Sequence, residues 1–222
     1  RSTLFPYTTL FRSPYRRRTR MAEIIEAHPL HKVSEALEQT FAGGGETAAL
    51  LRAIDWSATP LGSTDTWPHS LCCVLSICMN ARFPISIYWG AEHIMFYNDA
   101  AIPLHGDKHP WALGCPARKV WPELWDVVGR RFKRVMAGEA ISGEDEFLPM
   151  HRYGYIEECY FDCAASPIRG EGGHVVGIFA PGIETTYRVI AERRGLLLRR
   201  LVEDISAAVT AEQLYGDRKS VV

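Results

Sequence analysis

The chain has 222 residues, 47% of them hydrophobic and 23% charged, which is typical of a globular protein with one core and some extensions. Its 25 Lys and Arg residues are balanced by 26 Asp and Glu residues, so the net charge of -1 excludes a global field that would attract nucleic acid or an anionic membrane. The apolar run over residues 71–75 is far shorter than the roughly 20 residues that cross a bilayer, and we expect no membrane span.

The two ends of the chain lack the patterns of a folded protein. Residues 1–13 show neither a helical nor a strand period and repeat the same Leu-Phe units, so they resemble a translated sequencing adapter. Residues 217–222 resemble the reverse complement of that adapter in another frame. We therefore expect an artefactual or disordered tail over residues 1–20 and an artefactual tail over residues 215–222. The basic run within the first tail is better explained as a solvated or untranslated segment than as a nucleic-acid arm.

The cysteines favour a reducing compartment. None of the six forms a CxxC pair, and an aromatic-rich core of this size needs no disulfides. The N-terminus also lacks the continuous apolar stretch of a secretory signal. These features predict reduced thiols and a cytoplasmic location.

A helical leader is expected over residues 21–55, with three glycines at 43–45 followed by a short helix over residues 46–54. Asp65 or Thr66 is a suitable cap for a second helix that starts at Trp67 and Pro68. The apolar residues of this second helix recur at spacings of three and four, which predicts one buried face: Leu71, Val74, Leu75, Cys78 and Met79.

After Pro84 the apolar period changes from helical to extended. Residues 85–89 and 94–97 flank a turn at Gly90 and predict a hairpin. Asn98 and Asp99 can cap a short helix that ends at His105. Residues 121–136 then form an amphipathic helix with apolar residues on one side and basic residues opposite, ending at Gly138.

Three further strands are expected over residues 141–150, 155–168 and 174–183. Together with the first hairpin they predict an α+β fold, in which a five-stranded antiparallel sheet carries its helices on one face. Residues 144–146 are all acidic and are expected to form a solvent-facing edge that discourages strand pairing.

Three segments of the chain resemble a known family. They are DWSATPLGSTDTWPHSL from Asp55, FYNDAAIPLHGDKHPWALGCPARKVWPELWDVVG from Phe96, and YIEECYFDCAASPIRGEGGHVVGIFAPGIETT from Tyr155. In this order they resemble the N-terminal PAS domains of bacterial, often hybrid, sensor histidine kinases. The resemblance covers roughly residues 53–214 and implies a PAS sensory domain over residues 56–184, with a coupling helix over residues 185–214.

The resemblance also implies a two-component signalling function. The domain would relay a ligand, redox or partner signal through its C-terminal helix to histidine kinase domains in the parent chain. No histidine follows His174, and no Gly-rich phosphate cradle follows the helix, so this fragment is expected to have no catalytic residues. The alternative is a fragment of an enzyme such as a hydrolase, with Asp162 or Glu158 as a base. That alternative lacks a nucleophile–base pair at a recognisable spacing.

Signal coupling is expected where the last strand meets the helix. Glu184 and Thr185 precede Thr186, which can cap the coupling helix, and PAS domains typically end in a similar acidic-x-Thr turn. The coupling helix carries a short apolar seam that could pair with a second subunit, formed by Leu198, Leu201, Ile205 and Ala208. We therefore expect a homodimer. A helix that packs back on its own domain is the alternative, because two heptads are too few to specify a coiled coil.

A sheet-helix cavity that takes a small-molecule ligand is a further implication of the resemblance. Candidates for its lining are aromatic and polar residues near the strands and the following loop: Trp89, Tyr97, Asn98, His109, Trp111, Trp125 and Phe161. The alternative, and the commoner use of bulky rings, is that the aromatic residues fill a small core and leave no cavity.

No metal or cofactor is predicted for this cavity. Cys115 is not in the Asn-Cys-Arg-Phe setting of the photoreactive flavin class, and the helix over residues 121–136 has no histidine for a haem. His105 and His109 are four apart, but Gly106 and Pro110 break the helix that would align them on a metal.

Overall fold

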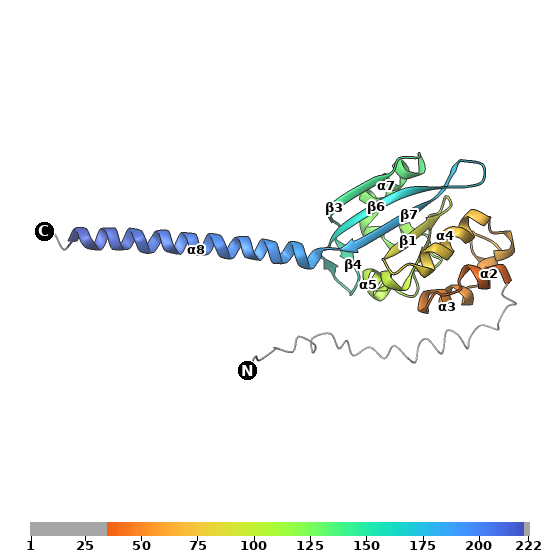
Figure 1. The fold of residues 1–222 in the computed structure, drawn as a ribbon, viewed down its shortest axis with the longest axis horizontal. Coiled ribbons are helices and arrows are strands. Elements are labelled where there is room, and N and C mark those ends of the chain that lie inside the picture. The colour runs from red at the N-terminus through yellow and green to blue at the C-terminus, as the bar shows by residue number, and fades with distance from the viewer. Residues whose placement is uncertain (1–34, 220–222) are drawn as a thin grey trace, which may run out of the picture. The chain divides into compact units, whose positions relative to one another are not determined.

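One antiparallel sheet organises the described part of the chain, which covers residues 35–219 of a computed structural model and the side chains of residues 38–209 (Figure 1). The five strands of this sheet lie in the order β2-β1-β7-β6-β3. Their bounds are Ile94–Tyr97 for β2, Ile85–Trp89 for β1, Val175–Glu184 for β7, Tyr160–Arg169 for β6 and Ile141–Phe147 for β3. The predicted α+β fold with a five-stranded antiparallel sheet is confirmed.

Short helices cover one face of the sheet, as predicted. They are α5 (Ile102–His105), α6 (Ala117–Val120) and α7 (Trp125–Met136). Tyr88 of β1 packs on Phe132 of α7 with 4.6 Å between ring centroids, and Tyr97 of β2 stacks on His105 of α5 at 3.8 Å. Since Ser86 pairs with Tyr97 and Tyr88 pairs with Met95, the even-numbered residues of β1 face these helices.

Helix α7 is shorter than the sequence predicted. It begins at Trp125 rather than at Trp121, and the 3-10 turn η5 (Pro122–Leu124) precedes it. Trp121 stands before a proline, which disfavours the helical conformation, and its backbone dihedrals are φ -121° and ψ 56°. The predicted C-terminal stop is present, because Gly138 adopts a positive φ of 102°.

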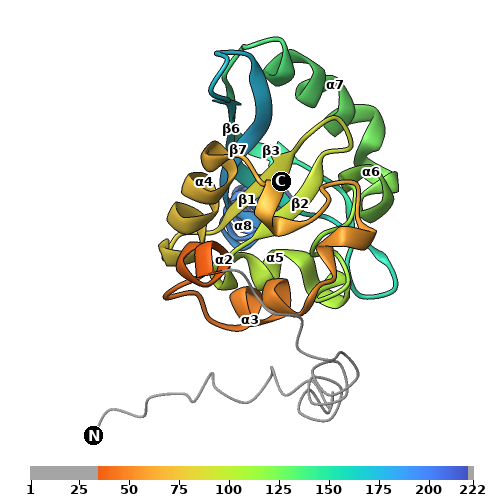
Figure 2. The same ribbon diagram turned by 90° about the vertical axis from the view of Figure 1, so that its right-hand side faces the viewer.

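The opposite face of the β1-β2 hairpin is covered by segments from earlier in the chain (Figure 2). Helix α4 (His69–Asn80) packs on β1 there, and Phe96 of β2 stacks on Trp56 with 5.3 Å between ring centroids. Helix α4 buries the predicted positions Leu71, Leu75, Cys78 and Met79, while Val74 is half-buried. The sheet is therefore enclosed on both sides at this end.

The start of α4 corrects the predicted cap. Thr64–Thr66 forms a separate 3-10 turn, η2, and the helix begins at His69 with Pro68 as the residue before it. Neither Asp65 nor Thr66 caps α4. The proline has φ -66° and ψ 149°, an extended conformation that separates the turn from the helix.

The described leader packs on the sheet domain. It contains α2 (Glu35–Thr40) and α3 (Glu46–Ala53), which matches the short helix predicted after the glycines. Asp99, next to β2, accepts hydrogen bonds at 2.9 Å and 2.8 Å from the backbone N–H groups of Glu46 and Thr47, so it caps α3 from a distant part of the sequence. The predicted tail over residues 1–20 and the beginning of the leader lie outside the described residues.

The strand predicted over residues 141–150 is divided. β3 ends at Phe147, and β4 (Met150–His151) pairs instead with β5 (Ile156–Glu157) in a separate two-stranded hairpin. Pro149 explains the break, because a proline has no N–H to continue the ladder. Because residues 156–157 belong to this hairpin, the next strand of the five-stranded sheet, β6, starts at Tyr160, later than predicted.

Helix α8 (Thr186–Lys219) follows β7 directly (Figure 1). It begins at the predicted cap residue and continues past the predicted end at Leu214, so residues 215–219 are helical. Among the described residues, no helix combines the length and the apolar composition needed to cross a membrane.

Candidate functional site

A cavity of about 250 Å³ lies between the sheet and α7. Strands β1, β3, β6 and β7 supply its floor, and α5, η5 and α7 supply its roof. Its walls are mainly apolar and include Leu104, Trp121, Leu124, Val128, Phe132, Ile141, Leu148, Met150, Phe161, Ala165 and Ala180. A cavity of this kind can hold a small molecule that is largely removed from water.

Few polar side chains line the cavity. Ser86 and Tyr88 reach it from β1, and burial raises the pKa of the Tyr88 hydroxyl to about 12, so this group stays protonated. Arg131 of α7 and Glu146 of β3 also line it and form an ion pair with each other. Glu146 therefore does not belong to a solvent-facing acidic edge, which corrects that prediction. The two charges offset each other at the wall.

His105 is the histidine of the cavity wall and is 3% exposed. Burial lowers its pKa to about 4, and the nearby charges of His109, Lys108 and Arg152 act in the same direction. The ring is neutral at pH 7 as a result. Its Nδ1 lies 2.8 Å from the carbonyl oxygen of Ala101, so Nδ1 carries the proton and donates it, and Nε2 remains an acceptor.

Of the residues predicted to line a pocket, Phe161 lines this cavity. Trp89 is buried but lies on the opposite face of β1, together with Ile85 and Ile87. Trp125 lies on α7 and packs against His93 and Phe132 without lining the cavity.

The next three predicted residues are close to one another but stabilise the fold around the cavity. Asn98 caps η3 (Asp99–Ala101), and its side chain also donates to the carbonyls of Ala81 and Phe83. The hydroxyl of Tyr97 lies 2.9 Å from Nδ1 of His109, whose Nε2 lies 3.2 Å from Glu46. This cluster joins the leader to the sheet, and none of its three predicted residues lines the cavity.

Trp111 lies elsewhere, 47% exposed, and lines a second hollow with Lys108 and Ile156. Cys115 is also outside the cavity lining, and its thiol donates to the carbonyl oxygen of Trp111. All six cysteines are free thiols. The described residues contain no group of three or more His, Cys, Asp or Glu side chains that could hold a metal ion.

The sequence contained a signal for the lining that the prediction missed. Ile85, Ile87 and Trp89 alternate with Ser86 and Tyr88, so a strict period of two assigns the polar pair to the cavity side. On α7, Val128 and Phe132 are four apart and share the inward face. His105 could not be found in this way, because its place depends on the packing of α5.

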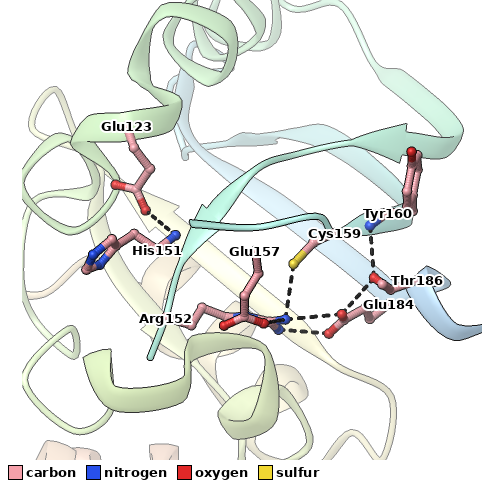
Figure 3. A network of polar contacts seen from close by, with 8 residues as sticks. All are labelled: Glu123, His151, Arg152, Glu157, Cys159, Tyr160, Glu184 and Thr186. Atoms are coloured by element: carbon pink, nitrogen blue, oxygen red, sulfur yellow. Dashed lines mark hydrogen bonds and ion pairs between the residues drawn. The ribbon is translucent and has the colours of Figure 1, made fainter. Parts of the chain in front are cut away.

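A second group of polar contacts joins the β4-β5 hairpin and the start of β6 to the end of β7 and the start of α8 (Figure 3). Arg152, with a side chain that is 6% exposed, donates to both carboxylate oxygens of Glu184 at 2.8 Å and 3.2 Å. It also donates to Glu157 at 2.7 Å and contacts the thiol of Cys159 at 3.1 Å. Burial alone would raise the pKa of Glu184, but hydrogen bonds from Arg152 and Thr186 hold it below its usual value. Glu184 is therefore ionised at neutral pH.

These contacts form a junction between the sheet and α8. The predicted coupling residues Glu184, Thr185 and Thr186 all contribute to it. The hydroxyl of Thr186 donates to Glu184 at 2.7 Å and accepts from the backbone N–H of Tyr160 at 3.0 Å. The Thr185 hydroxyl donates to Asp145 of β3 at 2.7 Å, and Asp145 also accepts from Arg188. Asp145 is thus a junction residue with φ 48° at a bulge, and not part of a free acidic edge. The first turn of α8 is attached to β3, β6 and β7.

The two residues considered as hydrolase bases lie away from the cavity. Glu158 pairs with Arg193 at 2.7 Å, and Asp162 accepts from the N–H of Asp145 and contacts Arg188 at 3.4 Å. Neither lines the cavity.

The apolar seam predicted on α8 is exposed. Leu198, Leu201 and Ile205 are 63%, 56% and 61% exposed, and Ala208 is exposed as well. The described part of the helix beyond its first turns therefore does not pack back on its own domain.

The described chain is thus an α+β domain with a cavity on one face of its sheet. The first turn of its C-terminal helix is held to the end of the sheet by hydrogen bonds and ion pairs. No protein-family model and no curated protein matches it. Among solved structures it is similar to an RNA-binding light-oxygen-voltage receptor, with 19% identity, a TM-score of 0.43, and coverage of 64% of this chain and 40% of that one. The chain therefore spans less than half the length of that receptor.

Two further solved structures are similar. A sensory box sensor histidine kinase from Vibrio cholerae shares 14% identity at a TM-score of 0.36, over 51% of this chain and 89% of that one. The PAS domain of BvgS from Bordetella pertussis shares 20% identity at a TM-score of 0.32, over 56% of this chain and 86% of that one.

Proposed function

We propose that this chain is a PAS-type sensory domain that transmits the state of its cavity through α8 to an output domain. A continuous path of contacts supports this function. Met150 lines the cavity, and two residues later Arg152 binds Glu184, which accepts from Thr186 at the start of α8. A molecule that displaces the cavity wall would act directly on this junction, provided that it binds two arrangements of the junction with different affinity.

Filling the cavity tests this coupling without a ligand. We expect Ala165→Leu, which adds volume at the cavity wall, to change amide hydrogen exchange in residues 188–192 by about twofold or more, while exchange in residues 200–209 stays the same. The matched control is Ser166→Leu, because the neighbouring residue of a strand points to the opposite face. Equal exchange in Ala165→Leu and the unaltered chain would refute coupling between the cavity and α8.

The output domain in this proposal is a histidine kinase of the parent chain, as the sequence resemblance implies. Helix α8 would connect the sensory domain to that kinase in the cytoplasm. The DNA that follows the codon of Gly216 in the source tests this part of the proposal. A phospho-accepting histidine on a helix, followed by an ATP-binding domain, is the expected result, and a hydrolase domain there would contradict it.

We further propose that two copies pair through α8. The exposed seam of Leu198, Leu201 and Ile205 supports this, because contiguous exposed apolar residues at helical spacing favour a partner helix. We expect Leu201→Lys to shift the chain toward the monomer in sedimentation velocity, with a dissociation constant raised about tenfold or more. Arg200→Lys, at the preceding position, is the control and should leave the dimer unchanged. A monomeric unaltered chain at high micromolar concentration would refute the dimer.

A further inference from the structure

We infer that the cavity takes a small, uncharged molecule of one or two rings that carries an N–H or O–H donor, and that Nε2 of His105 accepts this hydrogen bond. The inference rests on the proposed sensory function and specifies the class of ligand that the same cavity recognises. The size of the cavity, the chemistry of its walls, its charges and the acceptor of His105 each restrict the class of ligand.

The size and the walls favour a ring compound. An engineered apolar cavity of about 150 Å³ is known to take benzene, and the cavity here is less than twice as large at about 250 Å³. Tyr88 on the sheet and Phe132 on α7 pack on each other and form an aromatic part of the wall. Flat rings pack well against such groups, while a flexible polar molecule would lose its hydration along the apolar walls.

The charges of the wall favour an uncharged ligand. Arg131 and Glu146 are paired with each other, so neither offers a free charge to an ion. Arg134, which also borders the cavity, is paired with Glu139. A carboxylate or an ammonium group would enter without a partner and would retain the cost of losing its water.

The hydrogen-bond requirement comes from His105. Its Nδ1 donates to the carbonyl of Ala101, which leaves Nε2 as the acceptor of the ring, and the residue lines the cavity. Tyr97 stacks on the ring with 3.8 Å between centroids, and Trp121 lies at 5.7 Å with its plane tilted by 45°, so aromatic contacts hold the ring in place. A ligand N–H or O–H group that donates to this nitrogen would recover a hydrogen bond that the group loses when it leaves water.

Three probes separate these requirements: indole, 1-methylindole and benzoate. Indole has a ring and an N–H donor, 1-methylindole lacks the donor, and benzoate carries a charge. Calorimetric titration of the full 222-residue chain should give the tightest binding for indole, with 1-methylindole about three- to tenfold weaker. Benzoate should be the weakest of the three.

1-Methylindole differs from indole both in the lost N–H donor and in the added methyl group. The variant His105→Phe separates the effects of these two changes on affinity. Phenylalanine can retain the stacking on Tyr97 but offers no acceptor, so indole and 1-methylindole should bind it with nearly equal affinity. His105→Gln retains an acceptor and should keep part of the preference. Circular dichroism establishes that each variant is folded.

Three results would overturn the inference. They are tighter binding of benzoate than of indole, an unchanged indole preference in His105→Phe, and no binding of any probe at millimolar concentration. If exchange in α8 still responds to Ala165→Leu in such a case, the sensory function stands and only the ligand class fails. If neither response is observed, the sensory function fails as well.

Discussion

Replacing Arg152 by methionine is expected to destabilise the folded chain by about 3–5 kcal/mol, because it leaves two carboxylates without their shared cation. Glu157 and Glu184 have side chains that are only 16% and 26% exposed, so water replaces the lost hydrogen bonds incompletely. Urea unfolding followed by circular dichroism measures this change. Amide exchange in the first turn of α8 should also accelerate, because Glu184 would lose the group that orients it toward Thr186.

Arg188 provides a matched control for this prediction. It contacts three carboxylates, those of Asp145, Asp162 and Glu192, but its side chain is 49% exposed. Arg188→Met should therefore cost at most about 1 kcal/mol. Adding Glu184→Gln to Arg152→Met should recover part of the lost stability, since an amide needs no cation. Equal losses for Arg152→Met and Arg188→Met would show that burial does not strengthen the junction.

The sequence predicted the sheet because its strands follow local rules. Residues 85–89 alternate and residues 94–97 form a short apolar run after a glycine turn, and the structure forms β1 and β2 with the expected bounds. The break at Pro149 could also be predicted from the sequence, because proline has no N–H for the hydrogen bonds between strands. The predicted strand nevertheless extends through this residue. Local chemistry therefore determines most of the fold and even its main irregularity.

The cavity was harder to predict because its lining depends on contacts between distant residues. Large aromatic side chains are candidates both for the lining and for the packed core, and Trp89 and Trp125 pack next to the cavity without lining it. The polar residues that distinguish the cavity are His105 and the pair formed by Arg131 and Glu146. Their partners lie on other elements, so spacing along the chain carried no signal for them.

The junction is an intermediate case. The acidic-x-Thr turn at residues 184–186 was visible in the sequence, but Arg152 was not singled out, although it binds Glu184 across 32 positions. An arginine in a turn is normally a solvated residue, and nothing nearby in the sequence indicates that this one is buried. Its importance follows from the hairpin of β4 and β5, which places it against the end of β7.

Protonation of His105 should make the chain less stable in mild acid. Its pKa is about 4 in the folded chain, below the ordinary value of 6.5, because burial disfavours the charged ring. Between these two values the unfolded chain binds more protons than the folded chain, so stability falls as the pH falls from about 6.5 to about 4. Above this window the ring is neutral in both states and does not lower the free energy of unfolding. Below it, the protonation of His105 lowers the free energy of unfolding by about 3 kcal/mol at most.

The variant His105→Phe isolates this contribution. Carboxylates such as Glu184 and Asp99 have lowered pKa values and also lose stability in acid, so the unaltered chain alone cannot assign the effect. In His105→Phe those carboxylates remain, while the buried ionisable ring is gone. The difference in unfolding free energy between the two chains, measured in urea at several pH values, should slope between pH 4 and 6.5 and be flat above that window. A flat difference across the whole range would show that His105 is not held neutral by burial, and the acceptor that we assign to the cavity would lose its basis.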